Sequence, residues 1–246
     1  MSVAIVTGGS RGIGRAIVDR LMGDGWLVMT CGRGTRPGDL SEAVHWATCD
    51  VGDPKAATDL VAQAAALGRV EALVNNAGVQ VEKSVADSTD ADFDLVMDAN
   101  CRGVFNMCRA ALPGMTDTGG AIVNIGSISG QVSDPSMALY NASKAWVHAL
   151  TRSIAVDHGP NVRCNAIRPG WIMTAMADEA FDLADDPARA KSDALARHPV
   201  GRFGAPDDIA GVVAFLLSDD AAYVSGECFT VDGGMTAASP LNPGLF

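Results

Sequence analysis

The sequence predicts an α/β fold in which a doubly wound parallel sheet of about seven strands is flanked by helices on both faces. Short apolar runs rich in β-branched residues alternate with longer stretches of helical periodicity along the 246 residues. The apolar runs are hydrophobic throughout, which is typical of parallel strands covered on both faces. No repeat, low-complexity tract or linker interrupts this alternation, so we expect one domain over residues 1–246.

Each strand is expected where an apolar run ends in glycine or polar residues. The expected strands are residues 3–7, 27–31, 43–48, 70–74, 121–125, 162–167 and 228–231. Helices are expected where apolar residues recur every three or four positions. The expected helices are residues 11–22, 54–67, 90–115, 139–158 and 207–218.

Two connections depart from this regular alternation. The segment between Gly32 and Asp50 is too short for a full helix, and its glycines and proline oppose one, so we expect an irregular loop there. Residues 171–198 are rich in Asp and Glu and lie between a strand end and the last helix. Open α/β sheets place their ligand crevice there, so we interpret this stretch as a substrate lid.

Composition excludes several classes of function. Asp and Glu outnumber Lys and Arg to give a net charge of −11, and no basic run is present, so neither nucleic acid nor a membrane surface is an expected partner. No signal peptide and no run of ~20 apolar residues is apparent. The six cysteines form no CxxC pair and the four histidines are scattered, so no metal site is expected. We expect a cytoplasmic protein with reduced thiols.

A glycine-rich turn joins the first strand to the first helix. It reads Thr7-Gly8-Gly9-Ser10-Arg11-Gly12-Ile13-Gly14. Glycines permit a tight turn and close approach of a phosphate, and a helix N-terminus offers unpaired N–H groups and a positive dipole to a pyrophosphate. Such a turn alone is weak evidence, but its position at the first strand–helix crossover favours a nucleotide cofactor.

At this point the chain resembles the short-chain dehydrogenase/reductase family, in its single-domain branch. The resemblance rests on motifs in the order that the family shows. After the glycine turn these motifs are Asn75-Asn76-Ala77-Gly78, Ser127, Tyr140-Asn141-Ala142-Ser143-Lys144, Arg168-Pro169-Gly170 and Val231-Asp232-Gly233-Gly234. The resemblance implies a Rossmann-type fold and a homotetramer in which residues 139–158 and 90–115 pair across one axis.

The resemblance implies a catalytic set of Asn100, Ser127, Tyr140 and Lys144. Tyr140 and Lys144 are one helical turn apart, so their side chains emerge on one face. A free tyrosine has a pKa of ~10. An ammonium group ~4 Å away, at an effective dielectric constant of ~20, lowers that pKa by at most about three units. Ser127 is expected to hold the substrate oxygen, Lys144 also the nicotinamide ribose, and Asn100 to orient Lys144 through a water.

Cofactor choice is expected to depend on the end of the second strand. Family members that use NAD usually carry Asp at the position where this chain has Gly32. Here Arg33 follows, and Arg11 in the glycine turn is a second cation that could bind a 2′-phosphate. NADP(H) is therefore favoured over NAD(H). The expected cofactor-binding set is Gly8, Ser10, Arg11, Gly12, Ile13, Gly14, Arg33, Asp50, Val51, Asn76, Ala77, Gly78, Tyr140, Lys144, Pro169, Gly170, Ile172 and Thr174.

These observations predict an NADP(H)-dependent oxidoreductase that interconverts a small ketone and a secondary alcohol, with Tyr140 as proton donor and acceptor. Two alternatives stay open. One is a 3-oxoacyl-ACP reductase, which would need a basic patch for its acidic carrier, for which Arg102, Arg109, Arg152 and Arg168 are candidates. The other is a non-catalytic NADP-binding regulator, against which the complete catalytic set counts.

Overall fold

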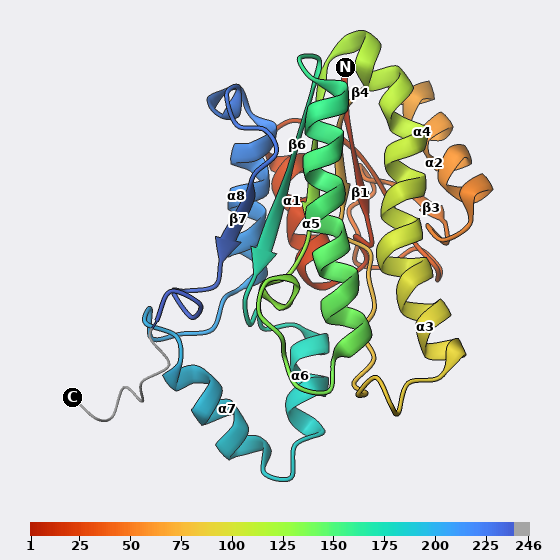
Figure 1. Cartoon of the computed structure of the whole chain (residues 1–246). Helices are drawn as coiled ribbons and strands as arrows, with labels where there is room; N and C mark the ends of the chain where they lie inside the picture. Colours follow the sequence, from red (N-terminus) through yellow and green to blue (C-terminus); the bar gives the residue numbers. More distant parts are fainter. Residues whose placement is uncertain (239–246) are drawn as a thin grey trace.

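The computed structural model describes residues 1–238, and its centre is a parallel sheet of seven strands (Figure 1). The strands are β1 (Ser2–Thr7), β2 (Leu27–Gly32), β3 (His45–Thr48), β4 (Arg69–Asn75), β5 (Gly120–Ile125), β6 (Val162–Pro169) and β7 (Cys228–Val231). Their spatial order is β3-β2-β1-β4-β5-β6-β7. Strands β2 and β3 are added on one side of β1, and β4 to β7 on the other. The strand order therefore reverses between β1 and β4, which is where such sheets bind ligands. The predicted doubly wound fold is confirmed.

Helices cover both faces of the sheet. They are α1 (Gly12–Gly23), α2 (Pro54–Leu67), α3 (Asp90–Met97), α4 (Gly103–Thr118), α5 (Ala138–His158), α6 (Ala175–Asp182), α7 (Pro187–Ala196) and α8 (Pro206–Leu217). Helices α2, α4 and α5 pack on one face around a core that includes Leu60, Met107 and Val147. Helices α1 and α8 pack on the other around Ile17 and Ile209. The strand side chains feed both cores, which explains why the strands are apolar throughout.

Most boundaries lie within a few residues of the predicted ones, and the clearest correction concerns residues 90–115. We expected a single helix there, but α3 and α4 are separated by a π-helical turn at Asp98–Arg102. A π-helical turn contains one residue more than an α-helical turn, and the spacing of apolar residues does not reveal such an insertion. π-Helical turns occur frequently at functional sites, and this one contains Asn100. The third strand begins at His45, two residues later than expected.

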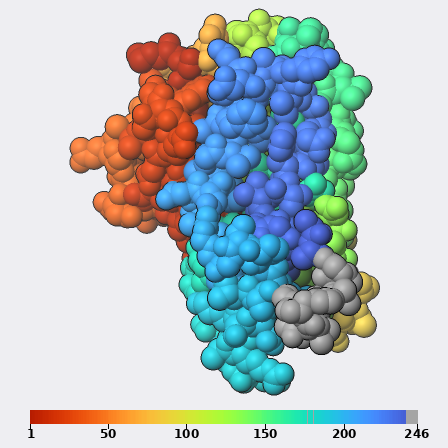
Figure 2. Space-filling view, turned by 90° about the vertical axis from the view of Figure 1, so that its left-hand side faces the viewer, coloured from red at the N-terminus to blue at the C-terminus, as the bar shows by residue number. Residues whose placement is uncertain are grey.

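The two irregular connections have the expected positions. Residues 33–44, between β2 and β3, contain no helix. Residues 171–198 contain α6 and α7, which lie beyond the carboxyl ends of the strands (Figure 1). In the space-filling view this segment, in cyan, extends below the body of the molecule (Figure 2). Phe181 of α6 stacks on Trp171 with ring centroids 4.7 Å apart, which ties the segment to the end of β6.

Within residues 1–238, no helix has the length and apolar character needed to cross a membrane. The same part of the chain holds no cluster of three or more His, Cys, Asp or Glu side chains that could bind a metal ion.

Candidate active site

The glycine turn leaves the N-terminus of α1 open. Gly8 has a φ of +70°, a left-handed conformation that strongly favours glycine and turns the chain out of β1. Gly14 has no room for a side chain, because a Cβ there would overlap the Gly8 carbonyl oxygen and the Asn76 amide. Arg11 is the N-cap of α1 but makes no side-chain cap. The first N–H groups of the helix are therefore free for an anion.

Thr7 and Asn76 fasten this turn to the next strand of the sheet. The Asn76 Nδ2 donates to the carbonyl oxygens of Thr7 and Gly8 at 3.0 and 3.1 Å. The Thr7 Oγ1 accepts from the backbone N–H groups of Asn76 and Ala77, each at 3.0 Å. Asn76 was predicted to line the adenosine side; in the structure it also holds the glycine turn. We did not predict this role for Thr7, although a polar residue at the end of an apolar strand indicates one.

The end of β2 carries arginine and no carboxylate. Arg33 and Arg11 are exposed and line the same cleft, together with Asp50. Gly32 has a packing reason as well as a functional one, because a Cβ there would lie 2.8 Å from Cη2 of Trp46 on β3. The indole ring therefore occupies the space into which an aspartate at position 32 would extend.

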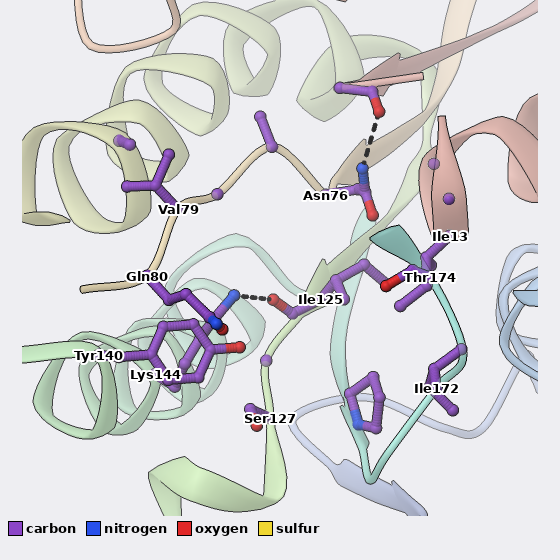
Figure 3. Close-up of a pocket in the computed structure, with 18 of the residues that line it drawn as sticks. Ile13, Asn76, Val79, Gln80, Ile125, Ser127, Tyr140, Lys144, Ile172 and Thr174 are labelled. Atoms are coloured by element: carbon purple, nitrogen blue, oxygen red, sulfur yellow. Dashed lines mark hydrogen bonds between the residues drawn. The ribbon is translucent and has the colours of Figure 1, made fainter. Parts of the chain in front are cut away.

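Tyr140 and Lys144 emerge from the same side of α5 and face the turn that follows β5 (Figure 3). Ser127, which caps a short 3₁₀ turn at Ile128–Gly130, lies opposite them in the cleft. The Lys144 Nζ donates to the Ile125 carbonyl oxygen at 2.9 Å. Three side chains, one from the turn after β5 and two from α5, thus meet at one end of the cleft.

The pKa of Tyr140 differs from the expected one. We expected Lys144 to lower the pKa of Tyr140, but burial raises that pKa to about 12, with Ser127 opposing the effect and the charge of Asp134 adding to it. The ammonium nitrogen of Lys144 lies 5.5 Å from the centre of the Tyr140 ring and is bonded to Ile125. Burial also lowers the pKa of Lys144 to about 8. Loss of hydration therefore outweighs the attraction between the two groups.

Asn100 lies behind the cleft wall. Its Oδ1 accepts from Val79 N at 2.8 Å, and its Nδ2 donates to Val79 O and to Ser143 Oγ, both at 2.9 Å. A Cβ at Gly78 would lie 3.1 Å from Asn100 Oδ1 and 3.6 Å from Lys144 Nζ. The π-helical turn thus aims a buried amide at the loop after β4. A water between Asn100 and Lys144 stays a prediction.

One cleft of about 700 Å³ runs from the glycine turn to Tyr140. All the predicted cofactor and catalytic residues except Asn100 line it, so the structure brings together residues that are far apart in sequence. The predicted residues along the cleft are Gly8, Ser10, Arg11, Gly12, Ile13, Gly14, Arg33, Asp50, Val51, Asn76, Ala77, Gly78, Ser127, Tyr140, Lys144, Pro169, Gly170, Ile172 and Thr174. Sequence reasoning missed Ser129, Asp134 and Trp171, which line the Tyr140 end.

An open helix N-terminus at the crossover of a doubly wound sheet, joined by one cleft to a Tyr–Lys pair, defines a nicotinamide-dependent oxidoreductase. The family comparison agrees, because a family model described as enoyl-(acyl carrier protein) reductase matches residues 8–236. The chain belongs to the short-chain dehydrogenase/reductase family, whose members include an alcohol dehydrogenase and 3-oxoacyl-(acyl carrier protein) reductases.

Individual relatives match over almost the whole chain. Over 246 residues the chain is 39% identical to 2-(S)-hydroxypropyl-CoM dehydrogenase 3 of Xanthobacter autotrophicus, covering 96% of each. It is 35% identical over 248 residues to the NADP-dependent (R)-specific alcohol dehydrogenase of Lentilactobacillus kefiri, again covering 96% of each. The ligand-free aldohexose dehydrogenase of Thermoplasma acidophilum superposes with a TM-score of 0.92 at 33% identity, covering 98% of this chain and 96% of that one.

Proposed function

We propose that this protein is an NADP(H)-dependent oxidoreductase that interconverts a ketone and a secondary alcohol. The observation that carries the proposal is the single cleft with an anion-binding helix terminus at one end and Ser127, Tyr140 and Lys144 at the other. A nucleotide cofactor bound along it would have its pyrophosphate at α1 and its reactive end beside the Tyr140 hydroxyl. Related proteins named as alcohol dehydrogenases support this reaction class.

The residues along the cleft fit NADP(H). The uncapped N-terminus of α1 and the closely packed Gly14 suit a pyrophosphate. Arg11 and Arg33 would hold a 2′-phosphate, because no carboxylate follows β2 to bind a free 2′-hydroxyl. Asp50 and Val51 are assigned to the adenine, Asn76, Ala77 and Gly78 to the adenosine side, and Pro169, Gly170, Ile172 and Thr174 to the nicotinamide end. When bound, the nicotinamide supplies or takes the hydride.

Tyr140, Ser127 and Lys144 together would carry out the proton transfer that accompanies hydride transfer. With its pKa raised to about 12, Tyr140 is protonated near neutral pH, so its hydroxyl can donate to the oxygen of a ketone as negative charge develops there. Ser127 holds that oxygen against the hydroxyl. Lys144, with a pKa of about 8, keeps a positive charge at neutral pH that stabilises tyrosinate once the proton has left. In the oxidising direction tyrosinate takes the proton back.

We also propose how the rest of the chain serves this site. Residues 171–198 would act as a substrate lid on a single domain, because Trp171 and residues of α6 line the cleft. A groove between α4 and α5 is lined by Phe105, Leu112 and Ile154, and we assign it to the contact between subunits of a homotetramer. All six cysteines are buried free thiols, which supports a cytoplasmic location.

A small carbonyl substrate is preferred over an acyl carrier protein. The cleft is lined by exposed Asp94, which would repel an acidic carrier, and by Asp98, whose charge is paired with that of Arg102. Of the four arginines expected to form a basic patch, Arg102, Arg109 and Arg168 have partners within the chain. Arg102 pairs with Asp98 at 2.6 Å, and Arg109 bonds Asn106 at 3.2 Å. Arg168 bonds Gln131.

The test is oxidation of NADPH and NADH by the purified protein over diketones, cyclic ketones, keto-sugars and a 3-oxoacyl thioester. Turnover of small ketones with NADPH supports the proposal. Turnover of the thioester alone would move the protein to acyl-chain reduction. A Tyr140→Phe variant separates enzyme from regulator, since an enzyme loses turnover while its cofactor affinity is retained.

A further inference from the structure

The carboxylate of Asp134 lies beside the reaction centre, at the Tyr140 end of the cleft. Asp134 lines the cleft together with Ser127 and Ser129. It belongs to residues 131–136, which are exposed except for Asp134 itself, whose side chain is half-buried. Burial raises the pKa of Tyr140, and the nearby negative charge of Asp134 adds to that effect. Charged side chains mostly point into solvent, so the inward position of Asp134 indicates a role inside the cleft.

Two contacts hold Asp134 in place and leave part of its carboxylate free. Ser129 Oγ donates to Asp134 Oδ2 at 2.6 Å. The Asp134 carbonyl oxygen accepts from Asn141 Nδ2 at 3.0 Å, and this contact fixes the loop to the first turn of α5. Within residues 1–238, Asp134 Oδ1 has no hydrogen-bond or ion-pair partner. A carboxylate only accepts, so this oxygen is free to bind a donor or a cation of a ligand.

The free carboxylate oxygen is close to the expected place of a ketone oxygen. Ser127 Oγ donates to Ser129 Oγ at 3.0 Å, so two hydrogen bonds separate Ser127 from the Asp134 carboxylate. When a ketone binds, the Ser127 hydroxyl would rotate and exchange Ser129 for the ketone oxygen, while the Ser129 N–H keeps Ser127 Oγ in place at 3.1 Å. A polar group on the carbon next to the carbonyl, or on the one after it, would then reach Asp134.

The cations of the cleft leave the charge of Asp134 uncompensated. Three cations line the cleft within the described residues, and none of them pairs with Asp134. Arg11 and Arg33 lie at the other end, at the glycine turn and after β2. The Lys144 ammonium donates to the carbonyl of Ile125, the last residue of β5. A ligand anion beside Asp134 would be repelled, and a ligand cation would be attracted.

Two further side chains of the cleft suit a cation that carries alkyl groups. Met137 precedes α5, and Trp171 follows β6; both line the cleft. The Trp171 ring is held in place by its stacking on Phe181. Indole rings attract ammonium groups, and those with methyl substituents are commonly recognised by aromatic side chains.

We propose that the substrate is a small amino ketone, or the matching amino alcohol, whose ammonium group binds the Asp134 carboxylate while its oxygen binds Ser127 and Tyr140. The inference rests on the proposed function, which places the ketone oxygen at those two hydroxyls. Asp134 is then a specificity-determining residue. A hydrogen bond between charged partners should favour the ammonium substrate about ten- to a hundredfold over a neutral ketone of the same shape.

Three ketones of nearly the same shape test this proposal. Dimethylaminoacetone, methyl isobutyl ketone and acetoacetate share an acetonyl group and end in an ammonium group, an isopropyl group and a carboxylate. At about pH 6 the amine carries its proton. With NADPH, kcat/KM should fall in the order given, and the first step should be about ten- to a hundredfold.

Variants locate the source of this preference. Asp134→Asn should bring the ratio of kcat/KM for dimethylaminoacetone to that for methyl isobutyl ketone close to one. The ratio cancels any effect of the variant on Tyr140, because both ketones use the same proton donor. Asp94→Asn is the matched control, because it removes an equal charge from the same cleft, and it should keep the parent ratio. Ser129→Ala removes the bond that orients the carboxylate and should lower the ratio in part.

Three outcomes would overturn the proposal. A ratio near one or a preference for acetoacetate in the parent protein would show that no carboxylate selects the substrate. A parent-like ratio in Asp134→Asn would assign the preference to another group. An equal loss in Asp94→Asn would show that the field of the whole cleft, and not contact with Asp134, is responsible. The parent ratio decides the matter even where Asp134→Asn does not fold.

Binding measurements keep this inference separate from the proposed function. The protein saturated with NADP⁺ cannot reduce a ketone, so calorimetry then measures ketone affinity alone. Dimethylaminoacetone should bind about ten- to a hundredfold more tightly than methyl isobutyl ketone, and Asp134→Asn should abolish the difference. Absence of turnover with every ketone would refute the proposed reaction and leave this result intact. Turnover of both ketones with equal affinities would refute the inference and leave the reaction established.

Discussion

Replacing Lys144 by methionine should make the protein more stable while abolishing its proposed activity. Lys144 is only 6% exposed, and burial lowers its pKa from the ordinary value of 10.5 to about 8. The unfolded chain regains the ordinary value and binds the proton more tightly, so stability rises with pH between about pH 8 and pH 10.5. Below pH 8 the full cost of the buried charge applies. That cost is about 3 kcal/mol at pH 7.

Methionine removes the charge and one hydrogen bond. Loss of the bond from Nζ to the Ile125 carbonyl offsets about 1 kcal/mol of the gain. The variant should therefore be more stable than the parent by about 2 kcal/mol at pH 7, equivalent to about 4–8 °C in Tm for a chain of this length. By about pH 9.5 the advantage should fall by about 2 kcal/mol, to nearly zero, because the parent has by then lost its buried proton.

Urea unfolding of both proteins at pH 7 and pH 9.5 measures this difference. Lys191→Met, which removes an exposed lysine of α7, is the control and should show no such pH-dependent gain. If Lys144→Met is less stable than the parent by the same amount at both pH values, the ammonium stabilises the fold and the reasoning is wrong. A stabilised and inactive variant would show that Lys144 is present for chemistry at the expense of stability.

Three further predictions concern the cleft. Tyr140→Phe should lower turnover about 10²–10⁴-fold and leave the Kd for NADPH unchanged, as kinetics and fluorescence titration would show; retained turnover would remove Tyr140 from proton transfer. Arg33→Ala should weaken NADPH binding about tenfold and leave NADH binding nearly unaltered, since an exposed cation contributes little beyond its phosphate contact; equal losses for both cofactors would contradict its role. Gly32→Ala should destabilise the fold by about 1–3 kcal/mol in urea unfolding, because the added Cβ would lie 2.8 Å from Trp46. Adding Trp46→Phe should restore stability, and a harmless Gly32→Ala would refute the packing argument.

Local patterns in the sequence predicted the sheet, the helices and the ends of the cleft. A continuous apolar run indicates a doubly covered strand whatever its neighbours are, and the glycine turn requires its conformation locally, as the φ of +70° at Gly8 shows. Two residues one turn apart, Tyr140 and Lys144, must share a helix face. These features depend on short segments, which is why they could be predicted.

Other features depend on contacts between distant segments. The π-helical turn around Asn100 meets the loop after β4, through two bonds to Val79, and no repeat in the sequence announces that contact. The pKa of Tyr140 depends on how much water the folded chain excludes, and this reversed the expected shift. Asp134 reaches the site only because the loop after the 3₁₀ turn folds back onto α5.

The most direct test of the account is to follow the hydride itself. NADPH carrying deuterium at the reactive carbon of its nicotinamide should be supplied together with a small ketone and a conjugated enoyl thioester. We expect deuterium on the carbinol carbon of the alcohol product, and none with Tyr140→Phe. Deuterium in the saturated chain of the thioester, with none in an alcohol, would show that the cleft reduces carbon–carbon double bonds and would contradict the proposed reaction.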